Sequence, residues 1–531
     1  MKIGGVISSH DCSFAILEDG LPVVHAELER YLRLKEPKGD AFAFMQKEYE
    51  DYNQVEYFVH PLDVWGGGPQ RWYPESWAKM KEIATKNGGD LLFVGHHRSH
   101  AANAFFSSNL EDAIIITIDG GGRDMKDGIP AAATITVWEG KDNKIKEIAI
   151  ITEDQINIGT MWADCTEKIF GLSRGYPKGN QCGTVMAMAC MGDASKYYDE
   201  FYNHRCRHRG FNYEKFRQIV SSSEQEAFDV AAALQRSTED IVREILTPFI
   251  KETKSRNICL SGGVVLNSVL TGKMLRDWFS DDLDNFYVCP VPYDAGLAIG
   301  AAQYVWHHHL DNPRITWEDN FTPYLGFKYS LDDVKLALEA KTGIEIQEGV
   351  SNLDVANLLA ESKIVSVFNE GSESGRRALG NRSILADPRS PDMKDLINEK
   401  VKHRQWFRPF APSILRESVK DWFKTDVDSP YMSYVIEFRD NVKDKVPAVV
   451  HYDGTARLQT VTEKDNPWYY NFIKTWESVS GVPILLNTSF NDREPIVETP
   501  TDAINCFLKT DIDFLYFAEF DILVSKDEQQ N

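Results

Sequence analysis

Residues 113–122 read Ala-Ile-Ile-Ile-Thr-Ile-Asp-Gly-Gly-Gly. The run before Asp119 is too continuously apolar to alternate, which predicts a strand that is buried on both faces and ends at the glycines. The same pattern of a short apolar run followed by glycine recurs at residues 258–263 and 364–371. Helical patterns such as residues 224–251 separate these runs. The chain is therefore predicted to be an α/β protein with ligands at its strand ends.

The length of 531 residues and the hydrophobic fraction of 43% allow two or three domains with large cores, at roughly 150 residues per domain. The chain turns irregular over residues 312–329, and a capped helix is predicted over residues 330–340. We expect the domain boundary there, between a first domain of residues 1–325 and a second of residues 326–531. The first domain opens with a predicted meander of three strands over residues 2–27, and no sequence repeat is visible.

Charge and cysteine content exclude several classes of protein. With 58 basic and 80 acidic residues, the net charge of −22 excludes a generic nucleic-acid coat. The eight cysteines are scattered and include no Cys-x-x-Cys pair, so neither a disulfide framework nor a zinc knuckle is predicted. The chain lacks a signal-peptide pattern at its start and any run of about 20 apolar residues. We expect a cytoplasmic protein that makes no use of a membrane.

A first group of residues has the composition of a metal site. His96 and His100 lie four residues apart and would share one face of a helix. For this pair alone, a structural role with hydrogen bonds to backbone or water is the better interpretation. Asp119 and Asp294 each stand at a predicted strand-to-glycine turn, which favours a functional site. Two histidines and two carboxylates would suit iron, manganese or zinc.

Glycine-rich turns form a second group. They occur at Gly4-Gly5, at residues 120–122 and at residues 261–263. Glycine lets backbone N–H groups approach a ligand closely, and a helix after Gly263 would favour phosphate. Three such turns in one domain predict a nucleotide site, for which the candidates are Gly121, Gly122, Gly262, Gly263 and Asn267.

The third group is rich in cations. Residues 373–383 and 402–413 combine arginine and lysine with glycine and serine. In an acidic chain this indicates a pocket for anions, built from guanidinium groups. Surface ion pairs are the alternative interpretation. Trp406, Phe407 and Phe410 argue against it, because they would bury the segment.

A series of short motifs extends through nearly the whole chain. They are His10-Asp11-x-Ser13, Glu29-Arg30, His96-His97-x-x-His100-Ala101-Ala102, Ser261-Gly262-Gly263-Val264-x-x-Asn267, Pro292-x-Asp294-x-Gly296-x-Ala298-x-Gly300-Ala301-Ala302, Arg377-Ala378-Leu379-Gly380-x-Arg382-Ser383, Phe407-Arg408-Pro409-Phe410-Ala411-Pro412-Ser413, Asp453-Gly454-Thr455-Ala456-Arg457-x-Gln459-Thr460 and Leu486-Asn487-Thr488-Ser489-Phe490-Asn491. In this order they resemble the O-carbamoyltransferases that modify nodulation factors and antibiotics.

The resemblance implies a fold and a reaction. The N-terminal domain would have the actin/hexokinase/Hsp70-like fold, akin to the domain that transfers threonylcarbamoyl groups to tRNA. The C-terminal α/β domain would resemble threonylcarbamoyl-adenylate synthase. Carbamoyl phosphate and ATP, with Mg²⁺, would give carbamoyl-adenylate in the C-terminal domain. The N-terminal domain would then pass the carbamoyl group to an acceptor hydroxyl.

The resemblance also implies roles for individual residues. His96, His100, Asp119 and Asp294 would hold a divalent metal, Fe(II) in such enzymes. His10, beside Asp11, would be the general base for the acceptor hydroxyl, since an alcohol is too weak an acid to ionise at neutral pH. The carbamoyl phosphate and ATP phosphates would be held by Arg377, Arg382, Lys402, Arg404, Arg408, Ser413, Asn487 and Ser489.

The sequence departs from the family pattern at three places. Cys182 and Thr184 stand where the family usually has an acid and a base, Arg376 where it has proline, and Arg493 where it has glycine. The first change puts the nucleotide or acceptor contacts of the N-terminal domain in doubt. It leaves the expected metal ligands in place.

Two segments are candidates for the acceptor site. Residues 65–77 are rich in aromatic side chains, among them Trp72, and residues 204–217 are basic, with Arg205, Arg207 and Arg209. Stacking groups among cations are typical of sites for single-stranded or flipped-out nucleic acid. A basic surface helix paired with acidic neighbours is an equally good interpretation.

The acceptor would accordingly be a hydroxymethylated pyrimidine nucleotide or DNA base, such as 5-hydroxymethylcytosine, or the hydroxyl of a sugar or natural product. Two further alternatives are threonylcarbamoyl transfer to tRNA and a non-catalytic nucleotide-binding scaffold. The scaffold would have no need of both the metal candidates and the phosphate-pocket cations. A homodimer is compatible with the sequence.

Overall fold

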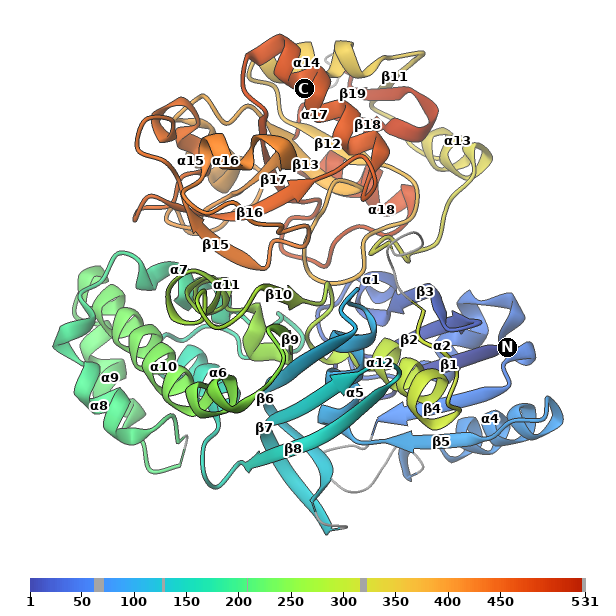
Figure 1. Ribbon diagram of the computed structural model, residues 1–531. Helices are drawn as coiled ribbons and strands as arrows, with labels where there is room; N and C mark the ends of the chain where they lie inside the picture. Colours follow the sequence, from blue (N-terminus) through green and yellow to red (C-terminus); the bar gives the residue numbers. More distant parts are fainter. Residues whose placement is uncertain (62–70, 127–128, 208, 316–321, 528–531) are drawn as a thin grey trace. The chain divides into compact units, whose positions relative to one another are not determined.

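The computed structural model describes residues 1–531 apart from 62–70, 127–128, 208, 316–321 and 528–531. The chain divides into two compact units, Met1–Phe321 and Thr322–Asn531, which we call the N-terminal and C-terminal units. Both combine β-sheets with helices (Figure 1), so the predicted α/β class is confirmed.

The first sheet of the N-terminal unit contains β1 (Lys2–Ile7), β2 (Ser13–Glu18), β3 (Leu21–Glu27), β4 (Tyr57–Pro61) and β5 (Leu91–Val94). The strand order is β3-β2-β1-β4-β5. The first three strands form the predicted antiparallel meander, and β4 and β5 continue the sheet parallel to β1.

The second sheet repeats this topology with β6 (Asp112–Lys126), β7 (Ile129–Lys141), β8 (Lys144–Thr152), β9 (Asn257–Ser261) and β10 (Asn285–Val288). Its order is β10-β9-β6-β7-β8, again a meander of three strands followed by two parallel ones. The duplication is the actin/hexokinase/Hsp70-like fold that the resemblance implied. It is a structural repeat that the sequence did not reveal.

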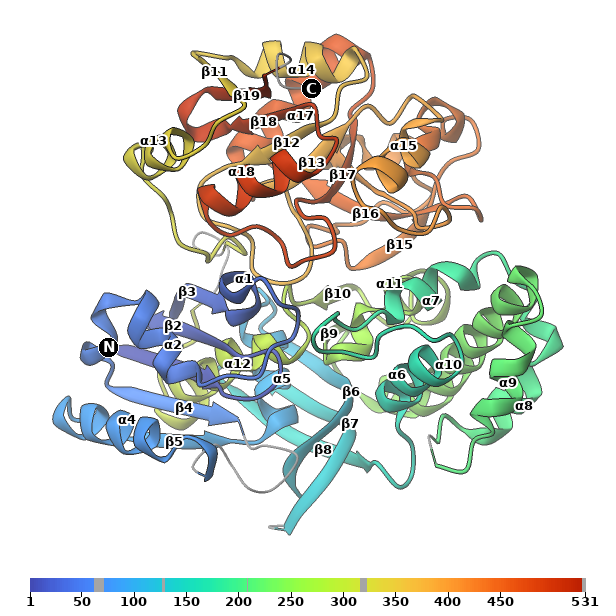
Figure 2. The same ribbon diagram turned by 180° about the vertical axis from the view of Figure 1, so that it is seen from behind.

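Two helices, α5 (His96–Phe106) and α12 (Leu297–Gln303), pack between the two sheets (Figures 1 and 2). On α5, Ala101 and Phe105 belong to a core cluster that includes Ile115 of β6. On α12, Ala301 and Ala302 pack in a core cluster of the first sheet. The histidine-bearing helix is therefore buried at the centre of the unit.

The other helices of the N-terminal unit lie outside this pair. The long helix α10 begins directly after its N-cap Ser223, whose side chain accepts a hydrogen bond from the Glu226 N–H. It packs against α7, α8 and α9. The bounds of these helices are α1 (Leu28–Leu32), α2 (Ala41–Glu48), α4 (Pro74–Lys86), α6 (Ile158–Lys168), α7 (Cys182–Ala189), α8 (Tyr198–His204), α9 (Tyr213–Val220), α10 (Glu224–Glu252) and α11 (Ser268–Lys273).

The apolar strand before the glycines at residues 120–122 is longer than predicted. It was expected to end at Gly120, but β6 continues through the glycines to Lys126. Its pairing with β7 shifts register between Ile118 and Gly122, which marks a β-bulge. Bulges bend a strand and re-aim side chains, and they are common beside functional sites. Here the bulge contains Asp119.

The C-terminal unit is built on one mixed sheet, in the order β11-β19-β18-β12-β13-β17-β14-β16-β15. The strands are β11 (Ile344–Glu348), β12 (Val365–Phe368), β13 (Arg382–Ala386), β14 (Ala411–Leu415), β15 (Tyr434–Glu437), β16 (Thr455–Val461), β17 (Ile484–Ser489), β18 (Phe514–Phe517) and β19 (Ile522–Lys526). The central strands β12, β13 and β14 are buried along their whole length. Of these, β12 belongs to the apolar run predicted from residues 364–371.

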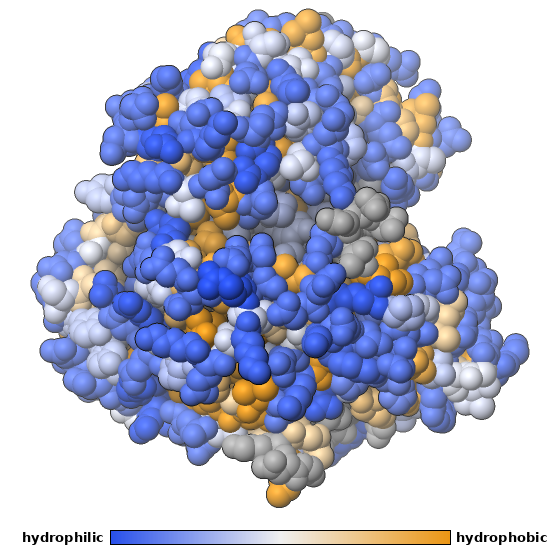
Figure 3. Space-filling model, in the orientation of Figure 1, coloured by the Kyte–Doolittle hydropathy of each residue, from blue (hydrophilic) through white to orange (hydrophobic). Residues whose placement is uncertain are grey.

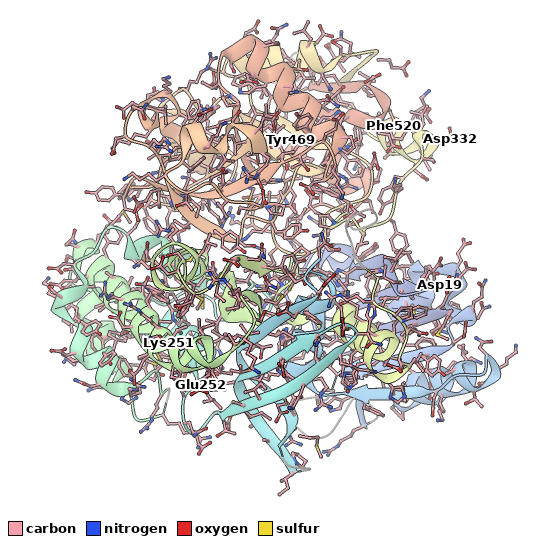
Figure 4. All side chains as sticks on the ribbon, in the orientation of Figure 1. Asp19, Lys251, Glu252, Asp332, Tyr469 and Phe520 are labelled. Carbon is pink, nitrogen blue, oxygen red and sulfur yellow. The ribbon has the colours of Figure 1, made fainter. Side chains whose placement is uncertain are left out.

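Helices cover this sheet. They are α13 (Leu331–Glu339), α14 (Asn352–Ala360), α15 (Met393–Lys400), α16 (Val419–Trp422), α17 (Pro467–Ser480) and α18 (Pro500–Lys509). A capping box between Ser330 and Asp333 starts α13, which confirms the predicted helix. On α17, Trp476 and Tyr469, the latter labelled in Figure 4, are fully buried.

The surface is mainly hydrophilic on the face that Figure 3 shows, with hydrophobic residues scattered among polar ones. Among the described helices, none is both long and apolar enough to cross a membrane.

Replacing Gly300 with alanine should destabilise the N-terminal unit. A Cβ at this position of α12 would lie 1.9 Å from the carbonyl oxygen of Ser99 on α5. We expect Gly300→Ala to lower the free energy of unfolding by about 1–3 kcal/mol, measured by urea denaturation. Gly183→Ala in α7 is the matched control, because a Cβ there meets nothing within 4 Å. Equal unfolding midpoints for the two variants would contradict this packing.

Candidate functional site

The two predicted histidines lie on the first turns of α5 and face the same carboxylates. Nε2 of His96 lies 3.1 Å from Oδ2 of Asp119 and 3.7 Å from Oδ1 of Asp294. Nε2 of His100 lies 3.4 Å from each of the same two atoms. Side chains from three separate parts of the sequence thus converge, as predicted for a metal site.

The β6 bulge and two glycines place Asp119. Its Oδ1 accepts a hydrogen bond of 3.0 Å from the backbone N–H of Gly263, which follows β9. Gly122 leaves room for the imidazole of His96, because a Cβ there would lie 2.2 Å from the ring. A strand without the bulge would continue the regular alternation of side chains through Asp119.

The loop that carries Asp294 is held from the first sheet. The carbonyl oxygen of Ala295 accepts hydrogen bonds from Oγ of Ser13, at 2.9 Å, and from the imidazole Nε2 of His25, at 3.0 Å. The hydroxyl of Tyr293 donates to Glu27 at the end of β3. Both sheets therefore contribute to the position of the carboxylates.

The four side chains fit a cation. One ligand atom from each lies within 4.8 Å of all the others. Nε2 of His100 is fully buried and makes no hydrogen bond to any described residue, while its Nδ1 lies 3.2 Å from the Ser261 hydroxyl. A buried polar atom without a partner is unfavourable. Nitrogen and carboxylate ligands in this ratio suit iron, manganese or zinc.

Charge in this cluster is strongly coupled. Burial favours the neutral form of His100, but the carboxylates of Asp119 and Asp294 outweigh it and raise the His100 pKa to about 9. Burial raises the pKa of Asp119, but the neighbouring imidazoles of His100 and His96 hold it well below its ordinary value. The site thus attracts positive charge, carried by protons or by a metal ion.

Two charged residues that the sequence analysis did not identify hold the ends of α5. Oδ2 of Asp124 accepts a hydrogen bond of 2.5 Å from the His97 N–H at the first turn. At the last turn, the Arg314 guanidinium donates to the carbonyl oxygens of Phe105, at 2.6 Å, and of Ser108, at 2.9 Å. An anion at the N-terminus and a cation at the C-terminus both complement the helix dipole.

His10 and Asp11 lie beside the cluster, in the turn between β1 and β2. Nδ1 of His10 lies 3.0 Å from Oδ2 of Asp11, and its Nε2 lies 3.5 Å from Oδ2 of Asp294. The His10 side chain is half exposed. It is therefore accessible from solvent and adjacent to the metal candidates.

The glycine group takes part in the backbone of this region. Gly121 and Gly262 have φ angles of 154° and 98°, which favour glycine. The helix expected after Gly263 is only a 3-10 turn, and the short α11 follows it. Asn267 caps α11 by accepting from the Leu270 N–H, and it donates to Gln235. The nucleotide site therefore stays a prediction.

The C-terminal unit gathers cations. Burial lowers the pKa of Arg404, Arg408 and Arg457, and the charges of Arg377, Arg404 and Arg408 lower that of Arg457 further. Nε of Arg457 is buried and makes no hydrogen bond among the described residues. Arg457 lies in the motif of residues 453–460 but was not among the residues predicted to bind phosphate. We call these four residues the arginine cluster.

The other candidates of this unit form hydrogen-bond networks. The Lys402 ammonium is buried and donates to the carbonyl and side-chain oxygens of Asn491, at 2.9 and 2.7 Å, and to the Ser489 carbonyl. The Asn487 amide donates to the Ser413 hydroxyl at 3.0 Å. Ser413, Asn487 and Gln459 thus hold one another at the centre of the sheet.

Arg382 is fully buried in β13. Its guanidinium donates to the carbonyl oxygens of Asn369, at 2.6 Å, and of Glu370, at 3.0 Å, and stacks 3.5 Å over the Phe368 ring. These contacts fix the loop after β12. Arg382 therefore positions backbone, whatever it contributes to phosphate binding.

Comparison with known proteins identifies the family of this chain. A model described as "Carbamoyltransferase N-terminus" matches residues 69–303, and one described as "Carbamoyltransferase C-terminus" matches residues 356–525. The chain belongs to the carbamoyltransferase family. The resemblance found in the sequence is thereby confirmed, and the carbamoyltransferase is an enzyme.

Individual proteins and solved structures also resemble this chain. The nodulation protein NolO of Bradyrhizobium diazoefficiens is 34% identical over 80% of this carbamoyltransferase and 78% of that protein. The uncharacterized protein sll1178 of Synechocystis is 30% identical over 96% of this chain and 94% of its own. Among solved structures, full-length HypF in its phosphate- and nucleotide-bound form aligns with 59% of this chain and 56% of that chain, at 15% identity and a TM-score of 0.35.

The arginine side chains proposed to contact the acceptor of the carbamoyltransferase already have partners within the protein. Arg205 forms an ion pair of 2.5 Å with Glu244, and Arg209 lies 3.8 Å from Glu153. Nε of Arg207 donates to the carbonyl oxygen of Gln155. This pattern agrees with the interpretation as a basic surface paired with acidic neighbours. In the aromatic segment, residues 65–70 lie outside the described residues, and Trp72 is half exposed.

The residues at which the carbamoyltransferase departs from the family pattern differ in their exposure to solvent. Cys182 and Thr184 begin α7, and Thr184 is buried. Arg493 is exposed, 3.8 Å from Asp492. Arg376 is half-buried beside Arg377.

Removing a histidine of the cluster should abolish metal binding by the carbamoyltransferase. His100→Ala deletes the buried imidazole between Asp119 and Asp294, so we expect it to lose most bound metal after loading with Fe(II), Mn(II) or Zn(II). Mass spectrometry of the metal content checks this. His403→Gln, a histidine of the C-terminal unit paired with Asp492, should keep about one ion per chain. Equal metal content in both variants would contradict the assignment.

Proposed function

We propose that this protein is an ATP-dependent O-carbamoyltransferase that works through carbamoyl-adenylate. The observation that carries the proposal is the arginine cluster. The guanidinium groups of Arg404, Arg408 and Arg457 are close enough to repel one another, and no ion pair joins them to a carboxylate among the described residues. These arginines are partly buried, and cations that are shielded from water and lack counter-ions are unfavourable. Phosphate groups would supply the missing negative charge.

The first step consumes three reactants. The acyl–phosphate bond of carbamoyl phosphate and the α–β phosphoanhydride bond of ATP break, and one water is taken up. A new bond joins the carbamate oxygen to the α-phosphorus, which gives carbamoyl-adenylate, pyrophosphate and inorganic phosphate. The arginine cluster and Lys402 would offset the charge that collects when two phosphate-bearing substrates meet, with Mg²⁺ accompanying ATP.

The second step transfers the carbamoyl group. The acceptor hydroxyl attacks the carbamoyl carbon, and AMP leaves with the bonding electrons. A divalent cation at His96, His100, Asp119 and Asp294, with Fe(II) as the family's implied metal, would supply Lewis-acid polarisation of a carbonyl. In its neutral form, His10 would accept the hydroxyl proton at Nε2, because Asp11 then accepts from Nδ1–H and Nε2 keeps its lone pair.

The acceptor is proposed to be a hydroxymethylated pyrimidine nucleotide or DNA base, with a sugar or natural-product hydroxyl as the second class. The exposed Trp72 is available to stack a ring of either kind. The ion pairs of Arg205 and Arg209 reduce the attraction for a polyanion. Among the pyrimidine acceptors, these pairs favour a free nucleotide over a DNA strand.

Pyrophosphate release tests the first step. The wild-type protein should release pyrophosphate from ATP when carbamoyl phosphate is added, and not when bicarbonate plus threonine replaces it. Arg457→Ala should slow the release about 100-fold or more, because removing one hydrogen-bond donor that stabilises negative charge in a transition state usually has an effect of this size. Arg439→Ala, an exposed arginine of the same unit, is the control and should match wild type. No release with carbamoyl phosphate would exclude the adenylate mechanism.

Mass measurement tests the acceptor. The protein is incubated with ATP, carbamoyl phosphate and either hydroxymethylcytidine nucleotide, hydroxymethylated DNA digested afterwards to nucleosides, or a panel of sugars. The proposed acceptor gains one carbamoyl mass. A gain on sugars and none on either pyrimidine substrate would assign the second class.

A further inference from the structure

His451 is a partly buried histidine of the C-terminal unit that the proposed mechanism does not use. It opens the turn before β16, where its backbone N–H donates to the carbonyl oxygen of Thr455 at 2.7 Å. Its Nδ1 lies 3.2 Å from Oγ1 of Thr455. Oγ1 in turn lies 2.6 Å from Oδ1 of Asp453. Three side chains therefore form a chain from a carboxylate through a hydroxyl to an imidazole.

This chain fixes the position of the proton on the ring. A carboxylate only accepts hydrogen bonds, so the single hydroxyl proton of Thr455 is donated to Asp453. The hydroxyl oxygen can then only accept from His451. Nδ1 of His451 consequently carries the proton, and Nε2 carries a lone pair.

That lone pair has no partner. Nε2 of His451 is buried and makes no hydrogen bond within the described part of the chain. Burial lowers the pKa of His451 to about 4, with the charge of Asp453 opposing this and those of Arg457 and Lys394 adding to it. The imidazole is thus neutral at physiological pH. It offers a buried acceptor, and leaving an acceptor unsatisfied is unfavourable.

The neighbouring side chains indicate which hydrogen-bond donor would pair with this lone pair. Arg457 stands two residues after Thr455 on β16, on the same side of the strand. Arginine and lysine side chains only donate hydrogen bonds, so the arginine cluster can bind phosphate and carbonyl oxygens but no N–H group. In carbamoyl phosphate, the carbonyl carbon that is bonded to the phosphate oxygen also carries an NH2 group. A molecule whose phosphate is held by arginines therefore needs a nearby acceptor for its amide.

We propose that Nε2 of His451 accepts a hydrogen bond from the amide N–H of carbamoyl phosphate and so selects this donor over acyl phosphates that lack an N–H. The assignment rests on the proposed function, because it assumes that the arginine cluster holds the phosphate of carbamoyl phosphate. His451 is then the group that distinguishes an amide from a methyl group of similar size. A site built around such an acceptor rejects the methyl analogue, because its polar atom stays unpaired.

Two stable analogues isolate this contact. Phosphonoacetamide and acetonylphosphonate have the same phosphonate and carbonyl groups and differ in an NH2 or a CH3 group. Titration calorimetry on the full-length protein measures both affinities. Wild type should prefer the amide about tenfold, the effect of one hydrogen bond. His451→Ala should reduce the preference to about one, and His451→Gln, which keeps an acceptor, should restore part of it.

Controls separate selection from folding. Tyr452→Phe changes an exposed neighbour in the same turn and should keep the wild-type preference. His451→Ala should bind inorganic phosphate as wild type does. If it does not, Thr455→Val provides the test, because it keeps the imidazole but removes the hydroxyl that holds the proton on Nδ1. A lowered preference for the amide in Thr455→Val supports the proposal, and an unchanged preference overturns it.

These outcomes distinguish a wrong assignment of His451 from a wrong proposed function. An amide preference that survives His451→Ala overturns the assignment of His451. Wild-type protein that releases pyrophosphate but binds both analogues equally also overturns it, and leaves the proposed function intact. Wild-type protein that releases no pyrophosphate with carbamoyl phosphate overturns the proposed function itself.

Discussion

The carboxylates of Asp119 and Asp294 cannot lie side by side in the interior without positive charge between them. Much of the N-terminal unit serves this requirement. A bulge in β6 positions one carboxylate, a loop held by the first sheet positions the other, and the buried helix α5 brings His96 and His100 against both. The duplicated fold supplies two sheets, and the charge cluster uses a contribution from each.

The C-terminal unit has the opposite arrangement. There, Arg404, Arg408 and Arg457 are partly buried near one another, and the charge of each disfavours the charged form of its neighbours. An anionic substrate relieves that repulsion, just as a cation relieves repulsion between carboxylates. Each unit thus stores unbalanced charge of one sign, in a protein whose net charge of −22 reveals neither.

The sequence predicted the parts of this structure that depend on local patterns. The apolar runs predicted buried strands, Ser330 predicted a helix start, and the spacing of His96 and His100 predicted a shared helical face. Features that arise from distant contacts were missed. No motif identifies Asp124 and Arg314 as partners of one helix, and a glycine run indicates a strand end as readily as a bulge. The family resemblance, carried by ordered motifs, supplied what the local patterns could not.

The partners of α5 have a consequence for folding. Arg314 and Phe105, which meet at its last turn, are 209 residues apart in the chain, and Asp294 reaches the first turn only through the loop that precedes α12. Closing loops of this length is entropically unfavourable until the surrounding sheets exist. We therefore expect the cluster of His96, His100, Asp119 and Asp294 to assemble late in folding. A chain that has folded only its first sheet and α5 has the histidines but lacks the strand and the turn that carry Asp119 and Asp294, so the candidate metal site is incomplete at that stage.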